Sequence, residues 1–287
     1  MWVRTPAFDL TRPREPLLPL VVSVPHSGTR LPREARRRLC VGEPVLRQLD
    51  DGPVDRLAEG ASVSGAVLLR ARYRRAYVDL NRDPNELDPE LVERLPPDVR
   101  PLLSLRVKAG LGVIPSRLGT RRLYAAPLSI AEVRRRLERA HVPYHACLAR
   151  EIEALRRRFR VVLLLDLHSM PDSAAWLEGR RIDVCIGDRF GQSAHRDLAE
   201  WLRRWLAAEG LRAAHNRPYA GGYVVARHAR PQAGIHALQL ELRRGLFMDE
   251  RAHRLHRGFE LLQQTFARLL RDLGSHLRTG GALSSVA

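Results

Sequence analysis

An apolar run near the middle of the chain limits the fold more than any other feature. The run covers residues 161–167, and its only charged member is Asp166. A strand of this composition is typically buried on both faces, as in a sheet between two layers of helices. Strand-like runs and helical segments alternate around it, which predicts an α/β fold with one central sheet. The other strand-like runs are residues 20–24, 66–69, 182–186 and 235–242, and the main helical segments are residues 130–159, 192–209 and 249–273.

The remaining segments predict further elements and one long loop. Residues 83–101 contain several prolines, and we expect an excursion of the kind that lines active sites. The sequence contains no internal repeat and no clear linker, so we expect a single domain over residues 1–278 and a disordered Gly/Ser-rich tail over residues 279–287. The other predictions are a helix over residues 44–59, strands over residues 75–80 and 223–226, and an interruption of the long helix near Pro143.

Composition places the chain among cytoplasmic globular proteins. Its 287 residues are 45% hydrophobic, which is enough to bury a sizeable core. No apolar stretch approaches the roughly 20 residues of a membrane span. The first ten residues include Asp9 and lack the apolar segment of a secretory signal. The three cysteines form no CxxC pair, and their odd number favours reduced thiols.

The formal net charge of +17 raises the possibility of an anionic partner. Nucleic-acid-binding proteins often carry such a charge. Here the basic residues are almost all arginine, with Lys108 the only lysine, and they are spread along the chain in helix-like clusters. A solvated helix face is the usual explanation of such clusters. We therefore do not expect specific nucleic-acid binding, although binding on an inherited enzyme fold stays open as an alternative.

Polar residues follow or end three predicted strands. His26 follows the first strand, His168 follows the central strand, and Glu241 ends the strand that begins near residue 235. In open α/β sheets ligands bind at the carboxyl ends of strands, so these side chains are able to converge. Two histidines and a carboxylate are a common zinc set, and Asp50 or Asp51 lies nearby to complete it. Glu241 is then available to deprotonate a water molecule.

Each of these residues also has a purely structural interpretation. The histidines fit loop hydrogen bonds, the aspartates fit helix caps, and Glu241 fits a surface pair with Arg243. The HExxH, Gly-x-Ser-x-Gly, Walker A and GxGxxG patterns are absent, which argues against zincin-type proteases, serine hydrolases of that type and phosphate-loop proteins. From spacing alone the sequence indicates no more than a possible metal site.

An ordered set of short motifs is more specific. Taken together over residues 21–250, these motifs resemble the N-formylglutamate amidohydrolase family. The matching segments are residues 24–28 (VPHSG), Asp51 with residues 54–57 (VDRL), 79–82 (DLNR), 110–114 (GLGVI), 143–145 (PYH), 166–170 (DLHSM), 183–191 (ending GDRFG), 216–223 (NRPYAGGY) and 236–241 (HALQLE).

The resemblance implies a three-layer α/β/α hydrolase with a central mixed sheet, related to zinc carboxypeptidases and aspartoacylases. Carried over residue by residue, it implies one Zn²⁺ ion on His26, Asp51 and His168, with Asp50 as the alternative to Asp51. It implies that Glu241 is the general base.

The resemblance also assigns residues to the substrate, which would be an anionic acylated amino acid. Arg75 would stabilise the oxyanion of the scissile carbonyl, and the pair Asn81-Arg82 would bind the substrate carboxylate. His145 is either a positioning or substrate-binding residue or a packed helix histidine.

Three functional hypotheses follow. The first is hydrolysis of N-formyl-L-glutamate to formate and L-glutamate, as in histidine degradation. The second is a zinc amidohydrolase or carboxypeptidase-like enzyme acting on another N-acyl amino acid or peptide. It stays open because residues 227–231 read RHARP where the family often has a Tyr-Gly pair, and because a fold does not fix a substrate. The third is the nucleic-acid-binding protein considered above. The oligomeric state is not predicted.

Overall fold

The centre of the protein is a mixed sheet of eight strands. The structure is a computed structural model that describes residues 1–14, 17–97 and 99–279. Four adjacent strands run parallel, and antiparallel pairs adjoin them on both sides of the sheet. This arrangement confirms the predicted α/β fold with a central mixed sheet. In spatial order the strands are β1 (Trp2–Arg4), β2 (Phe8–Thr11), β4 (Val67–Ala71), β3 (Leu20–Val24), β7 (Val162–Met170), β12 (Ile235–Arg243), β10 (Val184–Gly187) and β11 (Ala213–His215).

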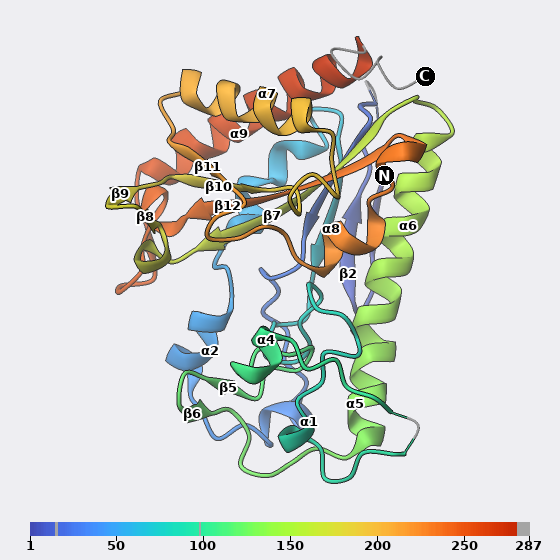
Figure 1. Cartoon of the computed structure of the whole chain (residues 1–287), viewed down its shortest axis with the longest axis vertical. Coiled ribbons are helices and arrows are strands. Elements are labelled where there is room, and N and C mark those ends of the chain that lie inside the picture. Colours follow the sequence, from blue (N-terminus) through green and yellow to red (C-terminus); the bar gives the residue numbers. More distant parts are fainter. Residues whose placement is uncertain (15–16, 98, 280–287) are drawn as a thin grey trace.

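Helices cover both faces of this sheet. Successive strand residues point to opposite faces, and the apolar residues of β3 illustrate this alternation. Val21 packs in one core with Leu148 of α6 (Val142–Arg156), whereas Val22 packs in a second core with Leu269 of α9 (Gly258–Arg278). Figure 1 shows α7 (Arg196–Ala208) and α9 on one side of the sheet, with α6 and α8 (Tyr223–His228) on the other. The molecule therefore has three layers, as the family resemblance implies.

The predicted helix over residues 44–59 is broken, which matters for the site. It forms as two short helices, α2 (Glu43–Leu49) and α3 (Val54–Leu57). Between them Gly52 adopts a φ of +65°, and Pro53 follows it. A residue that precedes proline avoids the α region, so the helix cannot continue through this point. The break places Asp51 in a loop instead of on a helix face.

The long helical region near Pro143 continues where an interruption was expected. Residues of α5 (Ile130–Arg136) pass through a π-helical turn at Leu137–His141 and directly into α6. Proline is tolerated in the first turn of a helix, and the π-turn ends immediately before that position. The irregularity near Pro143 is therefore a π-helical turn, which widens the helix and does not end it.

Two predicted strands are wrong. Residues 75–80 form a turn in which Tyr77 N donates to Arg74 O at 2.9 Å, because the apolar residues there are buried without a partner strand. Residues 223–226 belong to α8. Both Val224 and Val225 are fully buried, so tertiary packing overrides the β propensity of two adjacent valines.

The remaining elements are short. The predicted helix at residues 249–273 starts at Gly258, because a β-hairpin occupies the preceding segment. The described part of the excursion, residues 83–97 and 99–101, is irregular apart from one 3-10 turn. The short hairpins are β5 (Arg117–Leu118) with β6 (Arg121–Arg122), β8 (Trp176–Leu177) with β9 (Arg180–Arg181), and β13 (Met248–Asp249) with β14 (Arg254–Leu255). The short helices are α1 (Arg33–Arg36) and α4 (Leu105–Lys108). The 3-10 turns lie at Glu59–Ala61, Pro89–Leu91, Asp172–Ala174, Pro231–Ala233 and Arg244–Leu246.

Thr279 caps the C-terminal end of α9, and the rest of the predicted tail, residues 280–287, lies outside the described residues. The single domain over residues 1–278 stays a prediction. Among the residues that the structure describes, no helix is both long and apolar enough to cross a membrane.

Candidate metal centre and catalytic pocket

The register between β7 and β12 brings four polar side chains together. His168 lies opposite Glu241, and Asp166 lies opposite Gln239. Residues two apart on a strand share a face, so all four side chains point to the same side of the sheet. The prediction that His168 follows the central strand is wrong, because β7 continues to Met170. Its position near the carboxyl end of the strand nevertheless agrees with the expected place of a site.

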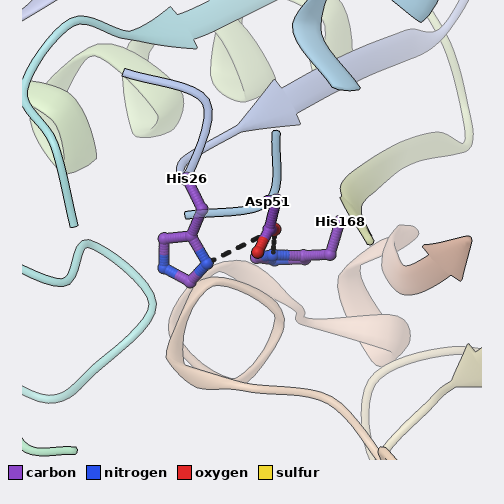
Figure 2. A group of neighbouring side chains, drawn as sticks. All are labelled: His26, Asp51 and His168. Carbon is purple, nitrogen blue, oxygen red and sulfur yellow. Dashed lines mark hydrogen bonds and ion pairs between the residues drawn. The ribbon is translucent and has the colours of Figure 1, made fainter. Parts of the chain in front are cut away.

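Three side chains from three elements converge at this edge. His26 lies two residues beyond β3, Asp51 lies in the loop between α2 and α3, and His168 lies on β7. One ligand atom from each residue lies within 4.8 Å of the others. The Nδ1 atom of His168 is 2.8 Å from Asp51 Oδ2, and the Nδ1 atom of His26 is 3.5 Å from the same oxygen. Figure 2 shows the two rings and the carboxylate pointing toward one another.

Carboxylates hold the opposite nitrogen of each ring. His26 Nε2 lies 2.7 Å from Asp79 Oδ1, and His168 Nε2 lies 2.8 Å from Asp166 Oδ2. A carboxylate at these distances accepts a hydrogen bond from Nε2–H, which leaves the unprotonated Nδ1 of a neutral imidazole facing the cluster. Among the described residues, Nδ1 of His26 is buried and has no hydrogen-bond partner. Such an atom is a preformed ligand position.

Buried charges compensate one another around these ligands. Burial raises the pKa of Asp51, but the neighbouring His26 and His168 outweigh it and hold that pKa well below its usual value. Burial likewise raises the pKa of Asp79, and Arg75 and His26 outweigh it. Burial lowers the pKa of His168, whereas Asp166 and Asp51 raise it well above the ordinary imidazole value. Asp51 and Asp79 are therefore ionised at neutral pH, as a cation-binding site requires.

The donor set fits a zinc ion. Two imidazole nitrogens and one carboxylate oxygen are a zinc set, and a hydrogen-bonded carboxylate behind each imidazole is the usual arrangement around such ligands. His26, Asp51 and His168 are all nearly fully buried, and the partnerless Nδ1 of His26 points into the group. The residues present thus match the group that the family resemblance implies.

The three ligands open onto a cavity of about 620 Å³ that also exposes Glu241. Burial raises the pKa of Glu241 to about 7, with the negative charge of Asp51 adding to the effect and His168 opposing it. Gln239 Nε2 donates a hydrogen bond of 2.9 Å to Glu241 Oε1, which fixes the orientation of the carboxyl group. A carboxyl group with a pKa near neutrality is able both to accept and to release a proton at physiological pH.

Two partly buried arginines, Arg75 and Arg82, line the same cavity. Arg75 Nε donates to Asp79 Oδ2 at 2.8 Å, so the carboxylate that holds His26 also positions this guanidinium. Arg82 donates from Nε to Leu111 O at 3.0 Å and from Nη1 to Asn81 O at 2.8 Å. These backbone bonds fix two edges of the Arg82 guanidinium in the cavity wall. The site therefore offers fixed positive charge close to the metal ligands.

Comparison with known proteins agrees with this geometry. The family model described as N-formylglutamate amidohydrolase matches residues 18–248. The N-formylglutamate deformylase of Pseudomonas aeruginosa is 34% identical over 269 residues, which cover 92% of this chain and 94% of the relative.

The chain belongs to the N-formylglutamate amidohydrolase family.

Two further relatives support the family assignment. The N-formylglutamate deformylase of Pseudomonas putida is 33% identical over 242 residues, covering 81% of this chain and 83% of the relative. The crystal structure of the N-formylglutamate amidohydrolase from Ralstonia eutropha superposes with a TM-score of 0.90 at 34% identity, covering 96% of this chain and all of that one. The recognition made from the motifs is therefore confirmed.

The structure places most of the predicted site residues in this cavity. His26, Asp51, Arg75, Asn81, Arg82, His168 and Glu241 all line it. The side chain of Asn81 is already engaged by the protein, since its Oδ1 accepts from Val224 N at 2.8 Å and its Nδ2 donates to Gln239 Oε1 at 3.2 Å. Binding of a substrate group by Asn81 stays a prediction.

His145 lies outside this cavity. It lines a separate cavity of about 510 Å³ beside α6, where it stacks on His228 with ring centroids 5.2 Å apart. Its Nε2 lies 2.9 Å from Leu80 O, so it supports the backbone next to Asn81. The arrangement agrees with a positioning role for His145 and gives no direct contact with the metal ligands.

The choice between Asp50 and Asp51 follows from where each side chain points. Asp51 joins the two histidines, whereas Asp50 points away and lies 2.8 Å from Arg74 Nε. The side chain of Ser169 holds the backbone of Asp51 in place, because Ser169 Oγ donates to Asp51 O at 2.7 Å. Asp51 is accordingly the residue of the pair that is placed to bind a metal.

Sequence reasoning gave no role to the residues behind the ligands. Asp79 opens the DLNR motif and Asp166 opens the DLHSM motif, so both were visible as motif members without a function. Asp166 and Gln239 each precede a site residue by two positions on a strand, which is a same-face spacing. That spacing was the available signal for both. Arg244, which donates from Nη2 to Asp50 O at 2.6 Å, gave no such signal.

Proposed function

We propose that this chain is a zinc amidohydrolase that hydrolyses N-formyl-L-glutamate to formate and L-glutamate. The observation that carries the proposal is the convergence of His26, Asp51 and His168 on one cavity that also contains Glu241 and fixed arginines. The names of the relatives agree with this substrate.

His26 and His168 through Nδ1, and Asp51 through a carboxylate oxygen, would hold the zinc ion. When bound, zinc supplies Lewis acidity, which polarises the formyl oxygen and lowers the pKa of a water molecule toward 7. Asp79 and Asp166 keep both imidazoles in the tautomer that presents Nδ1. The protein thus contributes a rigid set of donors whose orientation is fixed before substrate arrives.

Glu241 is the proposed general base and then the general acid. Its pKa of about 7 allows the carboxylate to take a proton from the attacking water and to pass it to the leaving amine nitrogen. Gln239 holds one oxygen of Glu241, so proton transfer would use the oxygen that the hydrogen bond leaves available. Burial of the group, which is 8% exposed, limits competing exchange with solvent.

Arg75 and Arg82 are the proposed partners of the oxyanion and of the α-carboxylate, respectively. Asp79 holds both Arg75 and His26, and this shared contact supports a role for Arg75 in stabilising the oxyanion that develops on the formyl oxygen. Arg82 lies on the cavity wall with two edges fixed by backbone carbonyls, which suits it to bind the α-carboxylate. A role in histidine degradation and a cytoplasmic location stay predictions.

The test is formate release from N-formyl-L-glutamate by the purified chain, with zinc-loaded and chelated samples side by side. We expect release that disappears with the chelator and returns with zinc. His168→Ala should lose bound zinc and activity together, because removal of one ligand leaves an incomplete site. His253→Ala is the matched control, since His253 is an exposed histidine on a turn far along the chain from the ligands.

Two outcomes would count against the proposal. Release that persists after complete removal of metal would exclude the zinc site as the catalytic centre. Absence of release from a protein that retains about one zinc ion would reject N-formyl-L-glutamate and direct the search to other N-acyl amino acids.

A further inference from the structure

Five arginines line the catalytic cavity, and two of them are unpaired. Arg75, Arg82 and Arg244 are held by carboxylate, carbonyl or hydroxyl oxygens of the protein. Among the described residues, no acidic side chain lies within ion-pair distance of Arg106 or Arg189, and neither guanidinium donates a hydrogen bond to the protein. Two unpaired cations in the wall of a substrate cavity indicate that an anionic group of the substrate binds there.

Arg106 is carried by an anchored turn. It lies on α4, whose Val107 is buried and whose first turn is capped by Ser104. The guanidinium carbon lies 5.6 Å from the centroid of the Tyr219 ring, which supports it from one side. Arg106 is itself exposed, and this contact places its guanidinium over Tyr219 at the cavity wall with its N–H groups available.

The charge of Arg106 reaches the proposed α-carboxylate site. Burial lowers the pKa of Arg82, Asp79 opposes the effect, and the charges of Arg75 and Arg106 lower it further. The like charges of Arg75, Arg82 and Arg106 therefore repel one another, and Asp79 opposes this effect at Arg82. A ligand with two carboxylates would relieve that repulsion.

Arg189 is held by a strained loop on the same wall. Arg189 and the next residue, Phe190, both have left-handed backbones, with φ of +54° and +56°. Two consecutive residues other than glycine rarely adopt this conformation, and such strain is concentrated at functional sites. Asp188 stabilises the loop by accepting from Gly191 N at 3.0 Å, and Arg189 N donates to Ala220 O at 2.7 Å.

The two arginines flank one short segment of the wall. Arg106 packs on Tyr219, and Arg189 packs so closely on Gly221 that a Cβ at that position would lie 3.1 Å from Arg189 Cγ. We propose that Arg106, together with Arg189 on the same segment of the wall, binds the side-chain carboxylate of the substrate and so selects an N-formyl amino acid with an acidic side chain over one with a neutral side chain. The inference rests on the proposed function and adds the residues that determine its specificity.

The chemistry of the substrate requires a second anion site. N-formyl-L-glutamate carries an α-carboxylate and a γ-carboxylate, and each needs a positively charged partner in the cavity. Arg82 accounts for one carboxylate. A planar guanidinium such as that of Arg106 suits the other, because it donates two parallel hydrogen bonds to a carboxylate.

The experiment compares N-formyl-L-glutamate with N-formyl-L-glutamine, which keeps the α-carboxylate but has an uncharged side chain of the same size. The variants are Arg106→Gln and Arg189→Gln in the zinc-loaded chain. Arg121→Gln, at an exposed arginine of the β5–β6 hairpin, is the control for the change in net charge. Zinc content and far-UV circular dichroism establish that each variant is folded and loaded.

We expect kcat/KM for N-formyl-L-glutamate to fall about 10- to 100-fold in Arg106→Gln, mainly through KM, because a charge-assisted pair with the γ-carboxylate is lost. The ratio of kcat/KM values for the two substrates should approach 1, while Arg121→Gln keeps the wild-type ratio. Arg189→Gln should lower the ratio in the same direction. An unchanged ratio in Arg106→Gln would overturn the proposal.

Binding of glutarate and butyrate, measured by calorimetry, separates this proposal from the proposed function. If the wild-type chain hydrolyses neither formyl substrate, the proposed function fails. The second carboxylate site then still stands if the chain prefers glutarate to butyrate and Arg106→Gln removes the preference. Equal affinity of the wild-type chain for glutarate and butyrate would overturn it.

Discussion

Replacement of Asp79 by Asn tests how the metal centre is supported. The carboxylate makes three contacts at once: Oδ1 lies 2.7 Å from His26 Nε2 and 2.8 Å from Asn81 N, and Oδ2 lies 2.8 Å from Arg75 Nε. In Asp79→Asn the amide oxygen is able to keep the first two contacts. The amide NH₂ then faces the N–H of Arg75, so that third contact becomes a repulsion between donors.

The magnitude follows from these contacts. Loss of the negative charge behind His26 makes its Nδ1 a weaker donor, and changes of this kind typically lower metal affinity about 10- to 100-fold. That range corresponds to about 1.4–2.7 kcal/mol of binding free energy. Release of Arg75 should in addition lower kcat, because the guanidinium is no longer held against the reacting carbonyl.

Zinc affinity is measured by competition with a chromophoric chelator, and kcat is measured at saturating zinc. Asp166→Asn serves as the parallel variant on the His168 side, where it removes the charge behind the ring and leaves Arg75 in place. We expect weaker zinc binding in both variants and a fall in kcat at saturating zinc that is larger in Asp79→Asn. Wild-type zinc affinity in Asp79→Asn would refute the reasoning, because the carboxylate would then support only Arg75.

Three further predictions follow from individual residues. Glu241→Gln should keep one zinc ion per chain and lose about 10²- to 10⁴-fold in kcat; full activity would remove Glu241 from the mechanism. Arg82→Ala should raise KM for N-formyl-L-glutamate about 10- to 100-fold, from the loss of about 1.5–3 kcal/mol of charged hydrogen bonding, and an unchanged KM would move the carboxylate site elsewhere. Burial and His195 lower the pKa of His236 to about 4. The unfolded state therefore binds more protons between pH 6.5 and 4, and stability falls as the pH drops through this window. Between pH 7 and 5 this lowers the free energy of unfolding by about 2 kcal/mol. The free energy of unfolding of His236→Asn in urea should therefore depend on pH by that much less than the wild-type value. An identical pH dependence in the two chains would contradict the assignment.

The central strands could be predicted from sequence because their burial is complete, whereas β1 and β2, which are partly exposed, were not predicted. Leu20–Val24 and the apolar core of β7 are buried on both faces, and a segment of that kind has few alternatives to a central strand. The turn at residues 75–80 and the helix α8 could not be predicted. Their apolar residues carry the same burial signal as a strand, and only the absence or presence of a partner strand distinguishes them.

The sequence by itself determined which residues form the candidate site. Each ligand lies in a short motif, and the order of the motifs along the chain identified the family before any geometry was known. Sequence motifs are informative here because metal binding depends on residue type, and residue type is read directly from the sequence.

Only the tertiary structure decided which side chains hold these residues in place and which further residues line the same cavity. The choice of Asp51 over Asp50 depends on the loop after α2, and the pairing of His26 with Asp79 joins residues 53 positions apart. The placement of Arg106 on Tyr219 joins α4 to a segment more than a hundred residues later. Contacts of this kind arise from strand register and loop closure across the whole chain, and residues distant in sequence carry no local mark of them.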